Sequence, residues 1–404
     1  MEKNYSNNRI LVTIYVLLMA ISLFSIYNAE LTSLKIMSVI FVCISACVIF
    51  FSGNINKLDY IWSITKRYLT LLSGIALMTT FIWIYRTESV GNILRGYEKI
   101  GYQVITICVA GAAVYMFGKK SIDYTVDAFI LFNLGALCLA LRQSGVQQAL
   151  EDVNYFIRNA GDARGFMKLL ELHDSSFVFG FFILYYIFFE KKTIKTILRL
   201  MMSIVFFIIG FKRIAIAALS ITVILVCILY LLKDEKMKSL IMSICGINMC
   251  ILGFLYVIGV RLEIFQLVTN EMAINTMGRN ELYQFIEPYY NISPFFIGRG
   301  FEFITQLFKT ETHEILNLAR IGALHNGFLT NYIELGFLGF WYWIVFRCIY
   351  LLNWIRQYGI KTKLLYFVCI FYISITYLTD NTAWYFFTSI VLCLIPMAYA
   401  YEQN

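Results

Sequence analysis

A histidine–asparagine pair in the last third of the chain is the feature with the clearest chemical use. His325 and Asn326 precede nine residues and then Gly336 and Gly339, which gives the pattern H-N-x9-G-x-x-G. A histidine titrates close to neutral pH and can take a proton from an attacking hydroxyl group. The pattern predicts His325 as a general base, and a helix cap at the membrane surface is the alternative.

Arginines upstream of this pair have the chemistry to hold a phosphate. Arg279 lies four residues before Tyr283, and Arg299 stands between Gly298 and Gly300. A guanidinium group keeps its charge and binds phosphate oxygens through two parallel hydrogen bonds. These arginines are therefore candidates for holding the charge of a phosphate group that reacts near His325. Arg279 as a solvated loop charge and Arg299 as part of a turn are the alternatives.

Membrane-spanning helices are the elements that must position these residues. The chain has 404 residues, of which 60% are hydrophobic and 14% are charged, whereas soluble domains carry roughly 25% charged residues. The apolar runs lack the alternation of barrel strands. We therefore expect an all-α polytopic membrane protein, a single transmembrane domain over residues 1–404. The twelve predicted spans are 10–27, 34–51, 67–85, 100–117, 124–141, 174–189, 195–211, 214–232, 239–260, 328–352, 364–379 and 383–401.

The distribution of basic residues predicts the orientation of these spans. Lysine and arginine cluster in alternate short segments, which the positive-inside rule assigns to the cytoplasm. Both termini are then cytoplasmic, and the long loops 142–173 and 262–327 lie outside, the larger one with the candidate active site. The net charge of +8 mostly reflects this bias and does not indicate nucleic-acid binding. Within the larger loop, the apolar spacing over 301–324 predicts short amphipathic helices at the membrane surface.

Lys212 and Arg213 form a basic pair on a short turn that is predicted to lie outside, against the charge bias. Such a pair predicts an anion site, and a snorkelling membrane anchor is the alternative.

Three further features are open between a functional and a structural role. His173 and Asp174 are adjacent at the predicted outer start of a span and resemble a His–carboxylate dyad, although Asp174 also fits a helix N-cap. Asp127 and Glu334 fall within predicted spans, where ionisable residues are costly and often functional, but either one also fits a structural ion pair.

Taken together, these motifs resemble those of the O-antigen ligases and the related O-antigen (Wzy-type) polymerases. The resemblance rests on H-N-x9-G-x-x-G from His325, on Gly278-Arg279 with Tyr283, on Gly298-x-Gly300, and on Phe211-Lys212-Arg213-Ile214-Ala215. It implies a GT-C-like, inverting, metal-independent glycosyltransferase of the bacterial inner membrane. The donor would be an undecaprenyl-diphosphate-linked glycan, and the acceptor another lipid-linked repeat unit in a polymerase or the lipid A core in a ligase.

Residue roles follow from the chemistry and the resemblance together. The catalytic set is His325, Arg279 and Arg213. The substrate-binding set is Arg299, Tyr283, Asn326, Lys212, Gly336 and Gly339.

No cofactor or metal is expected, because the three histidines show no ligand spacing and no Asp-x-Asp occurs. The expected partners are the lipid-linked oligosaccharide, the bilayer and, as a candidate, a chain-length regulator. A polymerase is the main interpretation and a ligase is the first alternative. A lipid-linked oligosaccharide flippase or other transporter is the alternative from another class, and a structural membrane subunit is the third.

The glycine pair gives a geometric expectation. If one helix runs on from His325, then Gly336 and Gly339 lie on the face of His325, deeper in the membrane. Small residues there permit either close helix packing or a groove for a polyprenyl chain.

Overall fold

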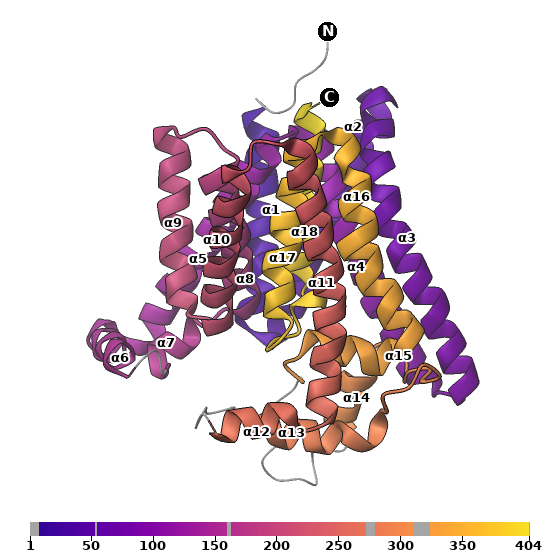
Figure 1. Cartoon of the computed structure of the whole chain (residues 1–404). Helices are drawn as coiled ribbons and strands as arrows, with labels where there is room; N and C mark the ends of the chain where they lie inside the picture. Colours follow the sequence, from indigo (N-terminus) through magenta and orange to yellow (C-terminus); the bar gives the residue numbers. More distant parts are fainter. Residues whose placement is uncertain (1–7, 53–54, 160–162, 272–278, 311–323, 404) are drawn as a thin grey trace. The chain divides into compact units, whose positions relative to one another are not determined.

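The computed structural model describes the chain except for residues 1–7, 53–54, 160–162, 272–278, 311–323 and 404. In the described part all regular secondary structure is helical (Figure 1). Nine helices within these ranges are long and apolar enough to cross a membrane. This agrees with the prediction of a polytopic helical protein.

Every predicted span overlaps a helix, but three of these helices are shorter than the 18 residues taken as the minimum for a membrane span. Helices α8 (His173–Phe188), α9 (Ile194–Gly210) and α17 (Ile360–Thr376) have 16, 17 and 17 residues. The count of twelve spans therefore stays a prediction. Conversely, α3 (Ile55–Arg86) and α4 (Val90–Phe117) begin well before the apolar windows, because polar residues continue a helix as readily as apolar ones do.

The chain divides into two compact units, and the division falls within α3 and α4. Unit 1 consists of residues 1–66, 105–230 and 385–404, and unit 2 consists of residues 67–104 and 231–384.

In unit 1, α8 packs against α9 and α18, and α1 packs against α2 and α5. Besides α8, α9 and parts of α3 and α4, its elements are α1 (Arg9–Tyr27), η2 (Ala29–Lys35), α2 (Ile36–Ser52), α5 (Lys120–Ser144), α6 (Val146–Arg158), α7 (Gly165–Leu169), α10 (Arg213–Leu231) and α18 (Phe386–Gln403).

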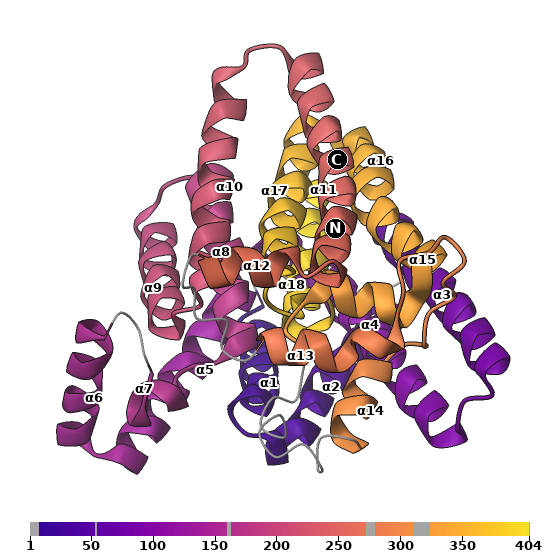
Figure 2. The same cartoon turned by 60° about the horizontal axis from the view of Figure 1, so that its bottom comes forward.

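In unit 2, α11 packs against both α15 and α17. Figures 1 and 2 show the short helices α12 and α13 running across one end of α11 rather than along it. Besides α17 and parts of α3 and α4, the elements are α11 (Glu235–Arg261), α12 (Ile264–Glu271), α13 (Arg279–Ile286), η3 (Glu287–Tyr289), α14 (Phe303–Thr310), α15 (Gly327–Val345), η5 (Phe346–Leu351), α16 (Leu352–Trp354), η6 (Ile355–Tyr358) and η7 (Thr382–Trp384). The loop predicted over 262–327 thus contains short helices.

Polar side chains set several helix starts. Asn8 accepts hydrogen bonds from the first amides of α1, Thr193 forms a capping box with Thr196 at α9, and Asp234 caps α11. Each cap satisfies amides that have no partner inside the helix. The sequence therefore fixes where these helices begin through single residues at the ends of the apolar runs.

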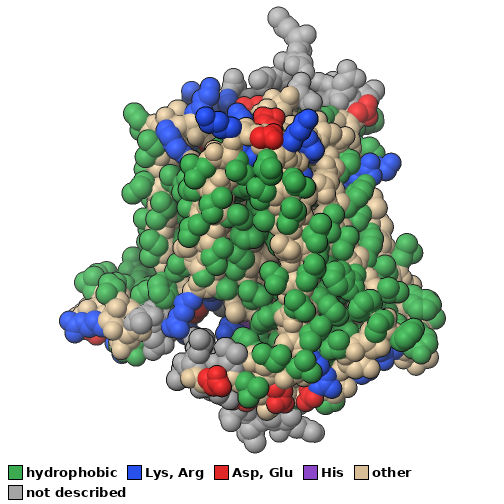
Figure 3. Space-filling view, viewed as in Figure 1, with side chains coloured by type: hydrophobic (Ala, Val, Ile, Leu, Met, Phe, Trp, Pro, Cys, Tyr) green, Lys and Arg blue, Asp and Glu red, His purple; other side chains and the backbone are tan. Residues whose placement is uncertain are grey.

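One face of α11 exposes large hydrophobic side chains along its length. Leu240, Ile244, Ile251, Leu252 and Leu255 are between 45% and 63% exposed. Figure 3 shows hydrophobic side chains along α11, with charged side chains gathered near its ends. Water is a poor solvent for such a face, and the acyl chains of a bilayer are a good one.

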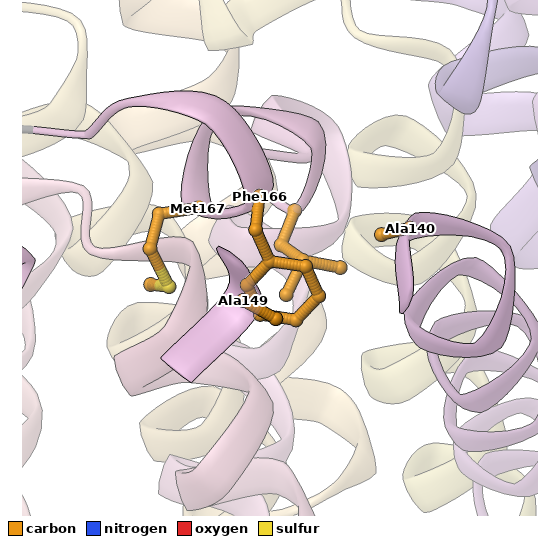
Figure 4. Packing of buried hydrophobic residues seen from close by; sticks show 5 residues of the cluster. Ala140, Ala149, Phe166 and Met167 are labelled. Atoms are coloured by element: carbon orange, nitrogen blue, oxygen red, sulfur yellow. The ribbon is translucent and has the colours of Figure 1, made fainter. Parts of the chain in front are cut away.

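Helices α6 and α7 of unit 1 are joined to α5 by a small apolar cluster. Ala140 of α5, Ala149 of α6, and Phe166 and Met167 of α7 pack together with Leu170 (Figure 4). The buried carboxylate of Asp152 accepts the backbone amide of Phe166 at 2.9 Å and pairs with Arg164 at 3.2 Å. The segment predicted as the first long outer loop is therefore folded on its own apolar cluster.

Candidate functional site

His325 and Asp380 meet in unit 2 although 54 residues separate them in sequence. His325 Nδ1 lies 3.8 Å from Asp380 Oδ1; the imidazole is 32% exposed and the carboxylate side chain is 8% exposed. This distance is longer than a hydrogen bond, and contacts of catalytic groups often tighten only when substrate binds. A carboxylate beside an imidazole orients the ring and stabilises the imidazolium that forms when the ring takes a proton.

The backbone around His325 holds this arrangement. His325 adopts a φ of +50°, a left-handed conformation that costs a non-glycine residue of the order of 1 kcal/mol. Asn326 then caps α15, because its side chain accepts the amide of Leu329 at 3.0 Å. Gly327 N donates to the carbonyls of Tyr377 and Asp380 at 2.8 and 3.0 Å. The start of α15 is thereby fixed to residues 377–381, the turn between α17 and η7.

The other side of this turn is held by η7. Thr376 and Thr382 share a hydrogen bond of 2.6 Å across the turn. Trp384 donates from its indole to Asn331 of α15 at 2.9 Å and accepts at its carbonyl from Gln103 at 3.0 Å. Asp380 therefore stands in a turn tied at both ends to helices of the same unit.

Arg279, the first residue of α13, approaches the same turn. Its Nη2 donates to the carbonyl of Thr379 at 3.3 Å, one residue before Asp380. The Nε of Arg279 is buried and has no hydrogen-bond partner among the described residues, and the same holds for Oδ1 of Asn280 and of Asn381. An unmet buried polar atom costs about 1–3 kcal/mol, so these three atoms have hydrogen-bonding capacity that the described residues do not meet.

Tyr283 links α13 to the start of α15. The buried Tyr283 hydroxyl accepts from Asn326 Nδ2 at 3.1 Å and also hydrogen-bonds with Tyr256 of α11. Tyr256 in turn donates to the carbonyl of Leu378 at 2.7 Å. Burial raises the pKa of Tyr283, although the hydrogen bonds with Tyr256 and Asn326 act in the opposite direction. Tyr283 and Asn326 hold the framework around His325, and whether they contact a substrate stays a prediction.

The glycine motif follows a different geometry from the expected one. Helix α15 begins at Gly327, not at His325, and Gly336 breaks it with a φ of +72° and a ψ of −176°. The expectation that Gly336 and Gly339 lie on the face of His325 along one helix is therefore wrong. A helix that changes direction at Gly336 carries no continuous face past that point.

A close backbone crossing explains Gly336. A Cβ at Gly336 would lie 2.2 Å from the carbonyl carbon of Ile297, and one at Gly298, whose φ is +99°, would lie 2.5 Å from the amide nitrogen of Gly336. Phe337 N donates to Phe296 O at 2.8 Å across the crossing. Gly339 serves packing, because a Cβ there would lie 2.7 Å from that of Leu335. Gly336 and Gly298 thus let two backbone segments touch, and whether Gly336 or Gly339 contacts a substrate stays a prediction.

Arg299 lies beside this crossing. Its amide donates to the carbonyl of Ile333 at 2.9 Å, and its Nε donates to the carbonyl of Tyr289 at 2.7 Å. Glu334 is buried there, and its carboxylate accepts the amide of Ile304 at 3.2 Å. Glu334 thus has a structural partner in α14.

The remaining predicted residues belong to unit 1. Lys212 pairs with Glu171 at 2.7 Å, which meets its charge within the unit. Arg213 is the first residue of α10 and is exposed. Asp127 forms a two-point contact with Arg199, with both distances at 2.7 Å. These ion pairs give Lys212 and Asp127 structural partners, and whether Lys212 or Arg213 binds an anion stays a prediction.

Asp174 caps a helix, but not its own. Its carboxylate accepts the amides of Phe387 and Thr388 at 2.9 Å each, and also the Thr388 hydroxyl. These are the first-turn amides of α18, which no intrahelical carbonyl can reach. The side chain of His173 lies outside the described part. Of the predicted His173–Asp174 dyad, the structure therefore describes only the contacts of Asp174.

The sequence analysis missed Asp380 and Arg86. Asp380 stands in a short polar turn between two apolar runs, an available signal that was passed over because the nearest histidine is so distant in sequence. Arg86 ends α3, and its Nε donates to the carbonyl of Gly298. The rule that outer basic residues are uncommon singled out Arg213 and would equally have singled out Arg86.

Among the described residues, no group of three or more His, Cys, Asp or Glu side chains is arranged to hold a metal ion. Comparison of the sequence with models of protein families and with curated proteins found no match.

Proposed function

We propose that this chain is a membrane glycosyltransferase that polymerises a surface polysaccharide. It transfers an undecaprenyl-diphosphate-linked glycan to a sugar hydroxyl of another lipid-linked repeat unit, on the outer face of a bacterial inner membrane. The observation that supports this most is the convergence of His325, Asp380 and Arg279 on residues 377–381. A base with its carboxylate and a cation with an unmet donor are the groups that this reaction requires.

The reaction assigns one task to each group. His325 takes the proton of the acceptor hydroxyl while that oxygen forms a bond to the anomeric carbon of the donor. The bond from this carbon to the diphosphate oxygen breaks, and the diphosphate leaves with the electron pair. Asp380 stabilises the imidazolium, and Arg279 holds the charge of the leaving diphosphate. Attack from the side opposite the diphosphate inverts the anomeric configuration.

The architecture belongs to the same proposal. Twelve spans, a GT-C-like arrangement and cytoplasmic termini would place loop 262–327 and residues 377–381 on the outer side, where lipid-linked repeat units are joined. Arg213 would be a further diphosphate contact. The ligase alternative uses the same chemistry with the lipid A core as acceptor.

A reconstituted transfer assay tests the proposal. Purified protein in vesicles receives a lipid-diphosphate-linked repeat unit, and the products are resolved by length. His325→Ala and His325→Gly should lower the transfer rate by about 10²-fold or more. His325→Gly should also leave the melting temperature unchanged or higher, because glycine adopts a φ of +50° without strain. Transfer at the wild-type rate by either variant would remove His325 from the mechanism.

Deletion of the gene separates the alternatives. A single repeat unit on lipid A core indicates a polymerase, polymer left on the lipid carrier indicates a ligase, and repeat units trapped on the inner side indicate a flippase.

A further inference from the structure

Helix α6 of unit 1 carries large apolar side chains that the described part of the chain leaves exposed. Val146, Leu150 and Ile157 are 66%, 67% and 72% exposed. They are four and then seven residues apart, which at about 100° per residue places them within about 40° of one another around the helix. We call these three residues the apolar stripe of α6. Such a stripe on a helix predicts a partner with an apolar surface.

The apolar stripe is separate from the face by which α6 packs on its own unit. Ala149, Val153 and Phe156 belong to the cluster that joins α6 to α5 and α7. On the other side of the stripe the helix exposes four polar residues, Gln147, Glu151, Asn154 and Arg158. The stripe therefore lies between a face that packs on protein and a face that suits water.

The end of α9 gives the level at which α6 lies. The ring centre of Phe156 in α6 is 4.9 Å from that of Phe211, the residue that caps the end of α9. Helix α9 exposes one apolar face down to its last turn, where Leu198, Met201, Val205 and Ile208 are between 43% and 63% exposed. The acyl chains of a bilayer are a good solvent for that face. Helix α6 thus lies beside the end of a surface that lipid covers.

Helix α6 also runs across the direction of α9. Figure 1 shows α9 along its length and α6 nearly end-on. In the same view, Figure 3 shows hydrophobic side chains on the upper side of the region of α6, nearer to the body of α9, with Lys or Arg side chains below them at the left tip. A helix that lies in the plane of a membrane interface has apolar side chains toward the acyl chains and charged ones toward water.

We propose that α6 is an in-plane membrane helix whose apolar stripe inserts among the acyl chains of one leaflet, at the level where α9 ends. The partner of this surface is the bilayer itself. This inference goes beyond the proposed function and does not depend on whether the chain transfers a sugar. It gives a specific task to part of 142–173, the segment that was predicted as an outer loop.

A bilayer fits the apolar stripe better than a protein partner does. Specific protein–protein interfaces use about 20–30 residues on each side, whereas the stripe has three residues beside an exposed polar face. The stripe also lies close to the apolar face of α9, which needs lipid in any case. A continuous lipid surface can cover both without a second specific interface.

Photocrosslinking in whole membranes identifies what covers the stripe. The full chain carries p-benzoylphenylalanine in place of Leu150 or Ile157, and the matched controls carry it in place of Gln147 or Asn154, which are exposed on the polar side of the same helix. Mass spectrometry after irradiation should show several-fold more phospholipid adducts at positions 150 and 157, because only these face acyl chains. Adducts of these two positions with a second copy of the chain or with another protein would overturn the proposal, and so would equal lipid adducts on both sides.

Hydrogen exchange in neutral-lipid nanodiscs provides a second test with natural side chains. Leu150→Gln and Ile157→Gln keep good helix formers and leave the cluster with α5 and α7 untouched, so the fold should persist. Amide exchange in α6 should become several-fold faster in both variants, because the helix loses contacts with the acyl chains. The control Asn154→Gln should leave exchange unchanged. Wild-type exchange in both stripe variants would show that the cluster alone holds α6 in place, and would overturn the proposal.

Discussion

Two aspartates that stand at the ends of apolar helices have opposite surroundings. In unit 1, Asp174 directly follows His173, yet both of its carboxylate oxygens are taken by the first turn of α18. In unit 2, Asp380 is 55 residues beyond His325, yet one of its oxygens lies 3.8 Å from the imidazole. Asp174 therefore caps a helix within unit 1, whereas Asp380 lies beside an imidazole that is distant in sequence.

The two carboxylates differ in the hydrogen-bond donors that surround them. Asp174 is buried, with 9% of its surface exposed, and is fixed by three donors, so a proton transfer there would break the cap of a helix. Asp380 receives a 2.8 Å hydrogen bond from the amide of Asn381, and its histidine partner is one-third exposed to reactants.

After His325, replacement of Asp380 should have the largest effect on transfer. Asp380→Asn keeps the shape of the side chain but removes the charge that stabilises the imidazolium. We expect the transfer rate to fall about 10²- to 10⁴-fold, measured in vesicles per folded molecule. A fall of less than threefold would place Asp380 in the same structural class as Asp174.

Replacement of Arg279 should have the next largest effect. Arg279→Lys keeps the charge but loses the planar fork and the contact to the Thr379 carbonyl. Transfer should drop about tenfold, and Arg279→Gln should drop it further. The control is Arg164→Gln in unit 1, whose partner Asp152 is part of the α6–α7 cluster. Equal effects of Arg279→Gln and Arg164→Gln on transfer would contradict a role for Arg279 in the reaction.

Replacement of Asp174 should change stability and leave the chemistry intact. Asp174→Asn keeps one acceptor but directs an NH2 group at amides that themselves donate. The expected loss is about 1–3 kcal/mol of unfolding free energy, measured by thermal unfolding in detergent. The transfer rate per folded molecule should equal that of the wild type. A specific loss of transfer at full stability would restore the His173–Asp174 pair as a candidate.

Low pH should reduce the local stability of α6 and α7, and this effect should be smaller than that of the substitutions above. The hydrogen bond from the Phe166 amide, together with Gln148 and Arg164, lowers the pKa of Asp152 in the folded protein. A lowered folded pKa contributes stability above the unfolded value, and this contribution is lost as the pH falls through the folded value. Hydrogen exchange in α6 and α7 should therefore accelerate below about pH 4, by the equivalent of about 1 kcal/mol. Asp152→Asn should show the faster exchange already at neutral pH, and an acid response retained in this variant would implicate another group.

Much of the helix inventory could be predicted from the sequence, because an apolar run must satisfy its own backbone hydrogen bonds in lipid. Every predicted span overlaps a helix, and His325, Asn326, Arg279 and Tyr283 all belong to unit 2. The break at Gly336 was not predictable from periodicity, because the reason for it lies at Ile297 and Gly298 on another segment. The partner of His325 was missed for the same reason, since spacing along a chain carries no information about a turn 54 residues away.

A double-mutant cycle on His325 and Asp380 tests the central claim most directly. The transfer rates of His325→Ala, Asp380→Asn and the double variant are measured under single-turnover conditions, with folding checked by thermal unfolding. If the two residues act as one acid–base unit, the double variant should be no slower than His325→Ala alone, because Asp380 acts only through the imidazole. Rate losses that multiply in the double variant would show that the residues act independently, and would contradict the dyad.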